Sequence, residues 1–298
     1  MHDAKVRGRF PRLPDMLLSF GLVARCFLAF MNILRHVDLT RVFFVDIETV
    51  PGHPSHAELP AAHQPLWARF CEKRHAKELA EGQTHAELFA NGGLYAEFGK
   101  VVCISVGFFR PLKDETLEFR TKSFAADDEC EVLRSFGQFL ARYAPYGPSR
   151  YAKLETAGPD GYFLCAHNGR EFDYGYLGRR MLICGQPIPP MLDVAGHKPW
   201  DLPHLLDTME LWKFGDNKGY ISLPLLAGVF NIPSPKDDID GSHVARVYWE
   251  DKDLGRIVTY CEKDVITTAR VYLHYAGQQE LWPEVQLTQV PWVAGVSA

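Results

Sequence analysis

The chain has 298 residues, of which 47% are hydrophobic and 23% are charged, and its 37 acidic against 32 Lys and Arg side chains give a formal net charge of -5. These proportions are typical of a soluble globular protein and exclude a disordered, collagen-like or disulfide-dense chain. The acidic balance also argues against a protein that holds nucleic acid by bulk charge alone, because such domains are usually basic.

The first thirty residues differ from the rest of the chain. Residues 1–15 are basic and interrupted by two prolines, and residues 16–30 are largely apolar around Arg25. This pattern resembles a signal peptide or membrane anchor, but an arginine inside an apolar span is costly in a bilayer. We therefore expect Met31 to be the natural start and residues 1–30 to be an N-terminal extension, disordered or partly helical. Membrane tethering through residues 16–30 is the alternative.

From Met31 onward the sequence predicts a single α/β domain, residues 31–298, on a five-stranded mixed sheet. Residues 41–45 are an unbroken apolar run, typical of a central buried strand, which should end at Asp46. A Pro/His-rich loop and two helices, over 64–80 and 84–96, then form a helical insertion over about residues 51–99. Later elements are expected as strands at 101–109, 116–123, 161–166 and 205–207, and as helices at 127–143, 172–184, 222–230 and 251–275, with Asp127, Ser222 and Asp251 at their starts.

The seven cysteines form no Cys-x-x-Cys pair, and several lie inside apolar runs, as Cys103 does. Buried thiols in odd number are typical of a protein from a reducing compartment. We expect every cysteine to be reduced, no zinc site, and a cytoplasmic protein without stable membrane association.

Acidic residues occur at three points where the predicted elements should meet. Asp46 and Glu48 lie two apart at the end of the first strand, so their side chains share one face. Asp173 starts the helix that follows the fourth strand, and ligand sites in open α/β sheets gather at such strand ends. Tyr260 and Asp264 lie four apart on one face of the last helix.

Taken singly, each of these motifs has an ordinary structural explanation, such as an exposed strand end or a favourable charge at a helix N-terminus. Four carboxylates in one cleft, however, cannot all be ionised without compensation. Oxygen ligands without Cys or His favour Mg²⁺ or Mn²⁺. Two such ions about 4 Å apart are the arrangement that cleaves phosphodiesters in line. Together the motifs therefore predict a site for two divalent cations.

The order Asp-x-Glu, Asn-x-x-x-Phe-Asp and Tyr-x-x-x-Asp resembles the three motifs of the DEDDy branch of the DnaQ-like 3′–5′ exonucleases. The motifs lie at Asp46–Glu48, Asn168–Asp173 and Tyr260–Asp264. The resemblance covers about residues 41–275 and is closer to stand-alone bacterial exonucleases similar to the proofreading domain of family B DNA polymerases. It implies a ribonuclease H-like fold, a five-stranded mixed sheet flanked by helices.

The resemblance also implies roles for individual residues. Asp46, Glu48, Asp173 and Asp264 would hold two Mg²⁺ or Mn²⁺ ions, with Asp46 bridging both, and Tyr260 would orient the attacking water. Further residues are candidates for contacts to the nucleic acid: Ile47, Thr49, Asn168 and Phe172 to the terminal nucleotides, and Arg170 and Arg180, among other basic residues, to phosphates.

The implied activity is hydrolysis of single-stranded DNA from its 3′ end, releasing nucleoside 5′-monophosphates, in DNA repair or in proofreading with replication or repair proteins as partners. An exoribonuclease is an alternative within the same chemistry, because discrimination of the sugar depends on contacts to the 2′ position. A non-catalytic nucleic-acid-binding module on the same fold is the other alternative, although the four acids and Tyr260 are all present.

Overall fold

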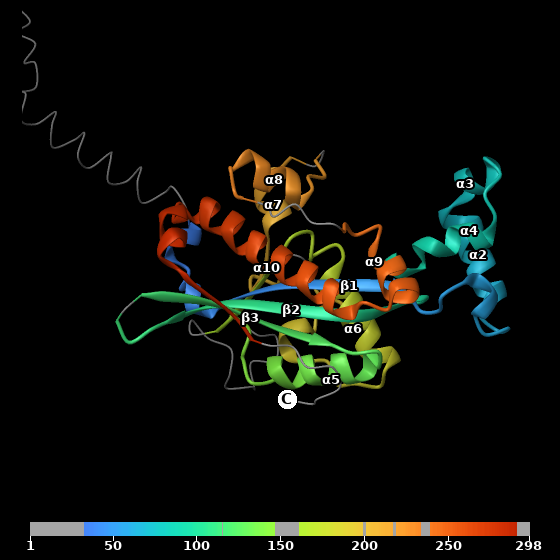
Figure 1. Ribbon diagram of the computed structural model, residues 1–298, viewed down its shortest axis with the longest axis horizontal. Helices are drawn as coiled ribbons and strands as arrows, with labels where there is room; N and C mark the ends of the chain where they lie inside the picture. The colour runs from blue at the N-terminus through green and yellow to red at the C-terminus, as the bar shows by residue number, and fades with distance from the viewer. Residues whose placement is uncertain are drawn as a thin grey trace, which may run out of the picture.

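The computed structural model describes residues 33–114, 116–146, 161–198, 201–216, 219–233 and 239–290, so the N-terminal extension lies outside the described residues. At its centre is a mixed six-stranded sheet of order β5-β4-β1-β2-β3-β6 (Figure 1). The strands are β1 (Val42–Pro51), β2 (Gly99–Pro111), β3 (Leu117–Ala125), β4 (Phe163–Ala166), β5 (Leu205–Asp207) and β6 (Gln286–Gln289).

The strand directions confirm the expected α/β class and the ribonuclease H-like sheet. β1 pairs antiparallel with β2 and parallel with β4, and β4 also pairs parallel with β5. The expected number of strands was wrong, because β6 adds a sixth strand parallel to β3. Its four residues are mostly exposed and show no apolar run. A contact made far away in sequence, from Gln289 Nε2 to Glu262 at 2.7 Å, helps to hold it in place.

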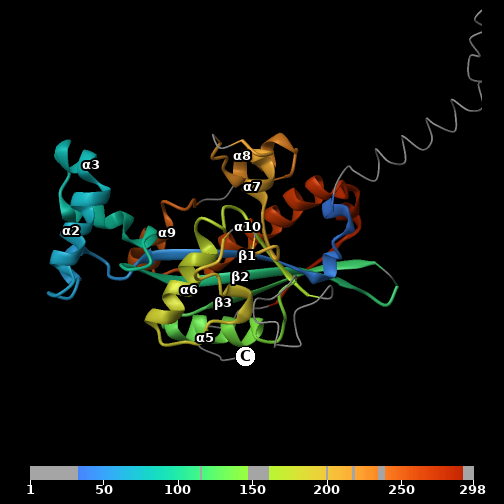
Figure 2. The same cartoon turned by 180° about the vertical axis from the view of Figure 1, so that it is seen from behind.

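Helices cover both faces of the sheet, and the alternation of β1 decides which residues meet which helices (Figures 1 and 2). Phe43, Val45 and Ile47 pack against α5 (Glu129–Leu140) and α6 (Asp173–Ile183) in one core cluster. Val42 and Phe44 pack on the opposite face against α10 (Leu254–Ala276). The even-numbered positions of β1 therefore face α10.

Several predicted boundaries differ from the structure. β1 does not end at Asp46 but continues to Pro51, because the residues beyond Asp46 remain paired with β2. Asp128 rather than Asp127 caps α5, accepting the Cys130 N–H at 2.9 Å. Asp253 rather than Asp251 caps α10.

Short helices connect the larger elements. They are α7 (Thr208–Lys213), α8 (Leu223–Val229), α9 (Val244–Arg246), the π-helix η7 (Val247–Asp251), and the 3₁₀ helices η1 (Ile33–His36), η2 (Leu39–Arg41), η3 (His56–Glu58), η5 (Pro190–Leu192) and η8 (Gln279–Glu284).

The segment between β1 and β2 is helical and projects from the end of β1 (Figure 1). It contains more and shorter helices than predicted: α2 (Gln64–Arg74), α3 (Ala76–Ala80), α4 (His85–Leu88) and the 3₁₀ helix η4 (Phe89–Leu94). Trp67 is fully buried at the centre of its own small core. This helical segment contacts the sheet at Gly93. An added Cβ at Gly93 would lie 2.9 Å from the Val50 backbone, so this close approach requires glycine.

A disulfide joins Cys130 on α5 to Cys184 at the end of α6, with a Cα–Cα distance of 5.4 Å. The prediction that every cysteine is reduced was therefore wrong. The two residues are 54 apart in sequence, and only the packing of α5 on α6 brings them together. The other cysteines of the described segments are buried free thiols: Cys71, Cys103, Cys165 and Cys261. Within the same segments, no helix is both long and apolar enough to cross a membrane.

We expect reduction of the Cys130–Cys184 bond to lower the free energy of unfolding by about 2–4 kcal/mol, because the freed loop raises the entropy of the unfolded chain. Urea unfolding of the oxidised and reduced protein measures this difference. The double variant Cys130→Ala/Cys184→Ala is the control, since its stability should not respond to reductant. Equal stability of oxidised and reduced wild type would contradict the prediction.

Candidate active site

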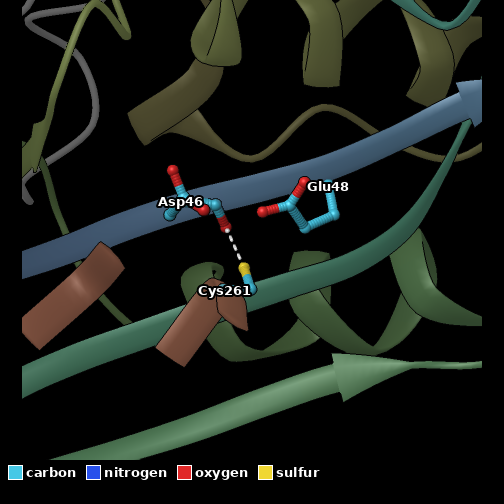
Figure 3. A group of neighbouring side chains, drawn as sticks. All are labelled: Asp46, Glu48 and Cys261. Atoms are coloured by element: carbon cyan, nitrogen blue, oxygen red, sulfur yellow. Dashed lines mark hydrogen bonds between the residues drawn. The ribbon is translucent and has the colours of Figure 1, made fainter. Parts of the chain in front are cut away.

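Strand β1 carries the first two predicted acids on the face covered by α10. Asp46 and Glu48 alternate with core residues, and a bulge between Glu48 and Thr49 follows them. Glu48 is only 7% exposed, and the Oδ2 atom of Asp46 is buried without a hydrogen-bond partner. Both side chains lie beside Cys261, and the ligand atoms of these three residues all lie within 4.8 Å of one another (Figure 3).

Helix α10 brings the third motif to the same place. Tyr260 and Asp264 lie on one helix face, and Asp264 is close enough for its charge to raise the pKa of the Tyr260 hydroxyl. Burial raises the pKa of Tyr260 strongly, and the charges of Asp264, Glu48 and Asp46 raise it further. The phenol therefore stays neutral at physiological pH, so it can donate and accept hydrogen bonds but cannot act as a phenolate base.

The second motif reaches the site from α6. Asp173 is 4% exposed and lies in the first turn of this helix, and the backbone N–H of Ile47 lowers the pKa of its carboxyl group. Ile47 lies between Asp46 and Glu48 on β1. The charge of Asp173 in turn raises the pKa values of Asp46 and Glu48, which relates the motif on α6 to the motif on β1.

The four acids repel one another because burial removes the solvent that would separate their charges. Burial is the main cause that raises the pKa values of Asp46 and Glu48 well above the ordinary range. The charges of Asp264 and Asp173 raise the pKa of both groups further. Burial also raises the pKa of Asp173 to about 7, although backbone N–H donors oppose the shift.

These electrostatics indicate a site for cations. In the described part of the chain, neither Asp46, Glu48 nor Asp173 forms an ion pair with Lys or Arg. A buried carboxylate cluster without a cationic partner is compensated by protons or by metal ions. The oxygen donors of Asp46 and Glu48, which lie within 4.8 Å of one another, therefore fit a divalent cation such as Mg²⁺ or Mn²⁺.

Asp207, at the end of β5, holds the turn that leads to Asp173. Its carboxylate is 2% exposed and accepts backbone N–H bonds from Asn168 at 3.0 Å, Arg170 at 3.0 Å and Met209 at 2.9 Å. Asp207 thus accepts a free backbone N–H at the N-terminus of α7. At the same time it fixes the backbone between β4 and α6. Asp207 therefore fixes the turn that leads to Asp173, and its charge also raises the pKa of Asp173.

The four side chains predicted to contact substrate differ in burial and in hydrogen bonding. The Ile47 side chain is buried in the core, and the Thr49 hydroxyl donates to the Gly93 carbonyl at 2.8 Å. Asn168 has a φ of 64°, and its Oδ1 atom is buried without a partner. Phe172 is half-buried against the core, with its ring centroid 5.1 Å from that of Tyr176. Of these four side chains, Thr49, Asn168 and Phe172 are therefore partly exposed, and Asn168 also has a free polar atom.

Two of the predicted phosphate contacts serve the fold instead. Arg170 donates to the carbonyl oxygens of Leu202 and Leu205 at 3.3 and 2.5 Å. Arg180 pairs with buried Glu129 and also donates to the Ala96 carbonyl at 2.8 Å. Both guanidinium groups are engaged in hydrogen bonds or ion pairs that link separate parts of the fold. These contacts do not support the expectation that the two arginines contact phosphates.

Residues 94–282 match a protein-family model described as a predicted 3′–5′ exonuclease related to the exonuclease domain of PolB. The chain belongs to this family. The match to the PolB-related exonuclease family includes Asp173, Tyr260 and Asp264, whereas Asp46 and Glu48 precede the matched residues. No curated protein matches the chain.

Among solved structures, this family member is similar to the family B DNA polymerase from the hyperthermophilic archaeon Pyrobaculum calidifontis. The two share 16% sequence identity and superpose with a TM-score of 0.45. The similarity covers 81% of this chain and 24% of the polymerase, so the chain spans about a quarter of the polymerase's length.

Proposed function

We propose that the chain is a metal-dependent 3′–5′ exonuclease of the DEDDy, DnaQ-like type, which removes nucleoside 5′-monophosphates from the 3′ ends of single-stranded DNA. The observation that carries this proposal is the pair of acids Asp46 and Glu48, which lie together on the β1 face that α10 covers, have no cationic side-chain partner, and feel the charges of Asp173 and Asp264. A ribonuclease H-like sheet with such acids on its central strand, just beyond the C-terminal end of the neighbouring parallel strand β4, fits phosphodiester hydrolysis.

The roles follow from what each side chain can do. Asp46, Glu48, Asp173 and Asp264 would hold two divalent cations, which when bound neutralise phosphate charge and supply an activated water. The nearby Ile47 N–H lowers the pKa of Asp173 and so favours its ionised form. Tyr260 stays protonated and positions the attacking water through its hydroxyl. In this proposal Phe172 stacks on the terminal nucleotides and Asn168 contacts the backbone.

The acids do not decide between DNA and RNA as the substrate. An exoribonuclease uses the same metal chemistry, and the discriminating contact would be to the 2′ position. Digestion of matched DNA and RNA oligomers tests the choice. Release of mononucleotides from DNA but not from RNA is expected, and the reverse preference would replace the DNA part of the proposal. Replication or repair proteins are the proposed partners.

We expect Tyr260→Phe to lower the rate of nucleotide release by about 10- to 100-fold while metal and DNA affinities remain largely unchanged, because one oriented hydrogen bond is lost. Single-turnover rates and equilibrium DNA binding measure the two effects separately. Tyr275→Phe is the matched control, since its hydroxyl lies on the same helix without a hydrogen-bond partner. Equal losses of rate and of DNA binding in Tyr260→Phe would show that Tyr260 is structural.

A further inference from the structure

A thiol lies among the acids, which the sequence pattern of oxygen ligands did not predict. Cys261 directly follows Tyr260 on α10, and its side chain is fully buried. Its Sγ atom donates to the backbone oxygen of Asp46 at 3.4 Å. Figure 3 shows the Cys261 sulfur next to β1, with its hydrogen bond running to Asp46 and with Glu48 beside them on the strand. The site therefore offers a soft donor beside two hard ones.

The two carboxylates independently indicate that this position binds a cation. Glu48 is 7% exposed, and in the described segments its carboxylate has no hydrogen bond or ion pair. The Oδ2 atom of Asp46 is buried and also lacks a partner. One carboxylate oxygen from each acid and the Cys261 sulfur lie within 4.8 Å of one another, and they form a candidate donor set of two oxygens and one sulfur.

Such a donor set distinguishes between metals. Zn²⁺ takes thiolate sulfur at about 2.3 Å and carboxylate oxygen at about 2.0–2.2 Å in a tetrahedral shell, which separates its ligands by about 3.5 Å. The donor atoms here lie within 4.8 Å of one another, so rotamer adjustments of about 1 Å suffice. Mg²⁺ takes oxygen ligands and leaves the thiol unused.

We propose that Cys261, Asp46 and Glu48 form a binding site for thiophilic divalent ions such as Zn²⁺ and Cd²⁺. When the metal–sulfur bond forms, the S–H bond breaks, the proton leaves to solvent, and the hydrogen bond to the Asp46 carbonyl is lost. Because the site shares two carboxylates with the proposed catalytic centre, a thiophilic ion excludes Mg²⁺ from them. The inhibition, but not the binding, rests on the proposed nuclease function.

Cadmium titration of the metal-free, full-length chain tests the binding, because a cadmium–thiolate bond absorbs in the near ultraviolet where Cd²⁺ and the protein's carboxylates do not. Wild type should show this absorption with one equivalent of Cd²⁺. Cys261→Ser should lose it, and Glu48→Gln, which keeps the thiol, should weaken the binding at least tenfold. Cys71→Ser is the matched control, since it removes another buried thiol in the helical segment between β1 and β2 and should leave the absorption unchanged.

Thermal unfolding of each variant shows that it is folded, and Cys261→Ala replaces Cys261→Ser if the serine variant is not. Full absorption in a folded Cys261 variant, or none in wild type, would overturn the proposal. Zinc inhibition is then measured against each variant's own rate with Mg²⁺, and Cys261→Ser should need at least tenfold more Zn²⁺ than wild type.

The two proposals fail in different ways. A cadmium–thiolate absorption in a chain without nuclease activity would contradict the proposed function and support the thiophilic site. Nuclease activity with Mg²⁺ in a chain without this absorption would contradict the thiophilic site and support the proposed function.

Discussion

Asp46→Asn is expected to lower the rate of nucleotide release from a 3′ end by a factor on the order of 10³ or more. Asp46 is central to the cluster, because the charges of both Asp264 and Asp173 act on its carboxylate. The amide keeps the shape of the side chain but removes the charge that holds a divalent cation. Several kcal/mol of charge stabilisation in the transition state are lost with that cation.

The same substitution should stabilise the metal-free protein, which separates loss of chemistry from loss of fold. Removing the Asp46 charge relieves the repulsion that raises the pKa of Glu48. Steady-state rates and thermal unfolding measure both effects, with Glu280→Gln as a control at an exposed position on η8. An Asp46→Asn protein that is folded and retains more than a tenth of the wild-type rate would contradict the assignment.

Without divalent cations, the protein is expected to lose stability as the pH rises from about 4 to above 7. Burial raises the pKa of Asp173 from 3.8 to about 7, and the pKa values of Asp46 and Glu48 shift in the same direction. Between these pH values the folded chain binds more protons than the unfolded chain, so the free energy of unfolding falls as the pH rises. For Asp173 alone the shift corresponds to about 4 kcal/mol.

Divalent cations should reverse this loss, because they bind the ionised cluster of the folded chain and not the dispersed carboxylates of the unfolded chain. Urea unfolding at pH 5 and pH 8, with Mn²⁺ and with chelator, measures the effect. Mn²⁺ should stabilise the protein much more at pH 8 than at pH 5, and Asp46→Asn should show a weaker response. A stability that changes with neither pH nor Mn²⁺ would show that the acids are not a coupled cation site.

The part of the site that the sequence predicted best depends on local periodicity. Alternation along β1 places Asp46 and Glu48 on one face, and a four-residue spacing places Tyr260 beside Asp264. Asp173 follows β4, which is parallel to β1, so its approach to the cluster follows from the sheet topology. These relations need only the type and order of the elements.

What the sequence did not predict depends on contacts between distant residues. β6 is polar and short, and its pairing with β3 and the contact from Gln289 to Glu262 define it. The Cys130–Cys184 bond depends on the packing of α5 against α6. Cys261 fits the apolar stripe of α10, and only its 3.4 Å contact with Asp46 shows that it borders the acids. No local pattern carries this information.

The central claim is tested most directly by digesting matched single-stranded oligomers labelled at either end, with Mg²⁺ or Mn²⁺ and with EDTA as the control. A metal-dependent 3′–5′ exonuclease releases the 3′ label at once as a mononucleotide, and it shortens the 5′-labelled strand one nucleotide at a time. We predict this pattern with either metal and no products in EDTA. Early release of the 5′ label as a mononucleotide, or digestion that continues in EDTA, would contradict the account.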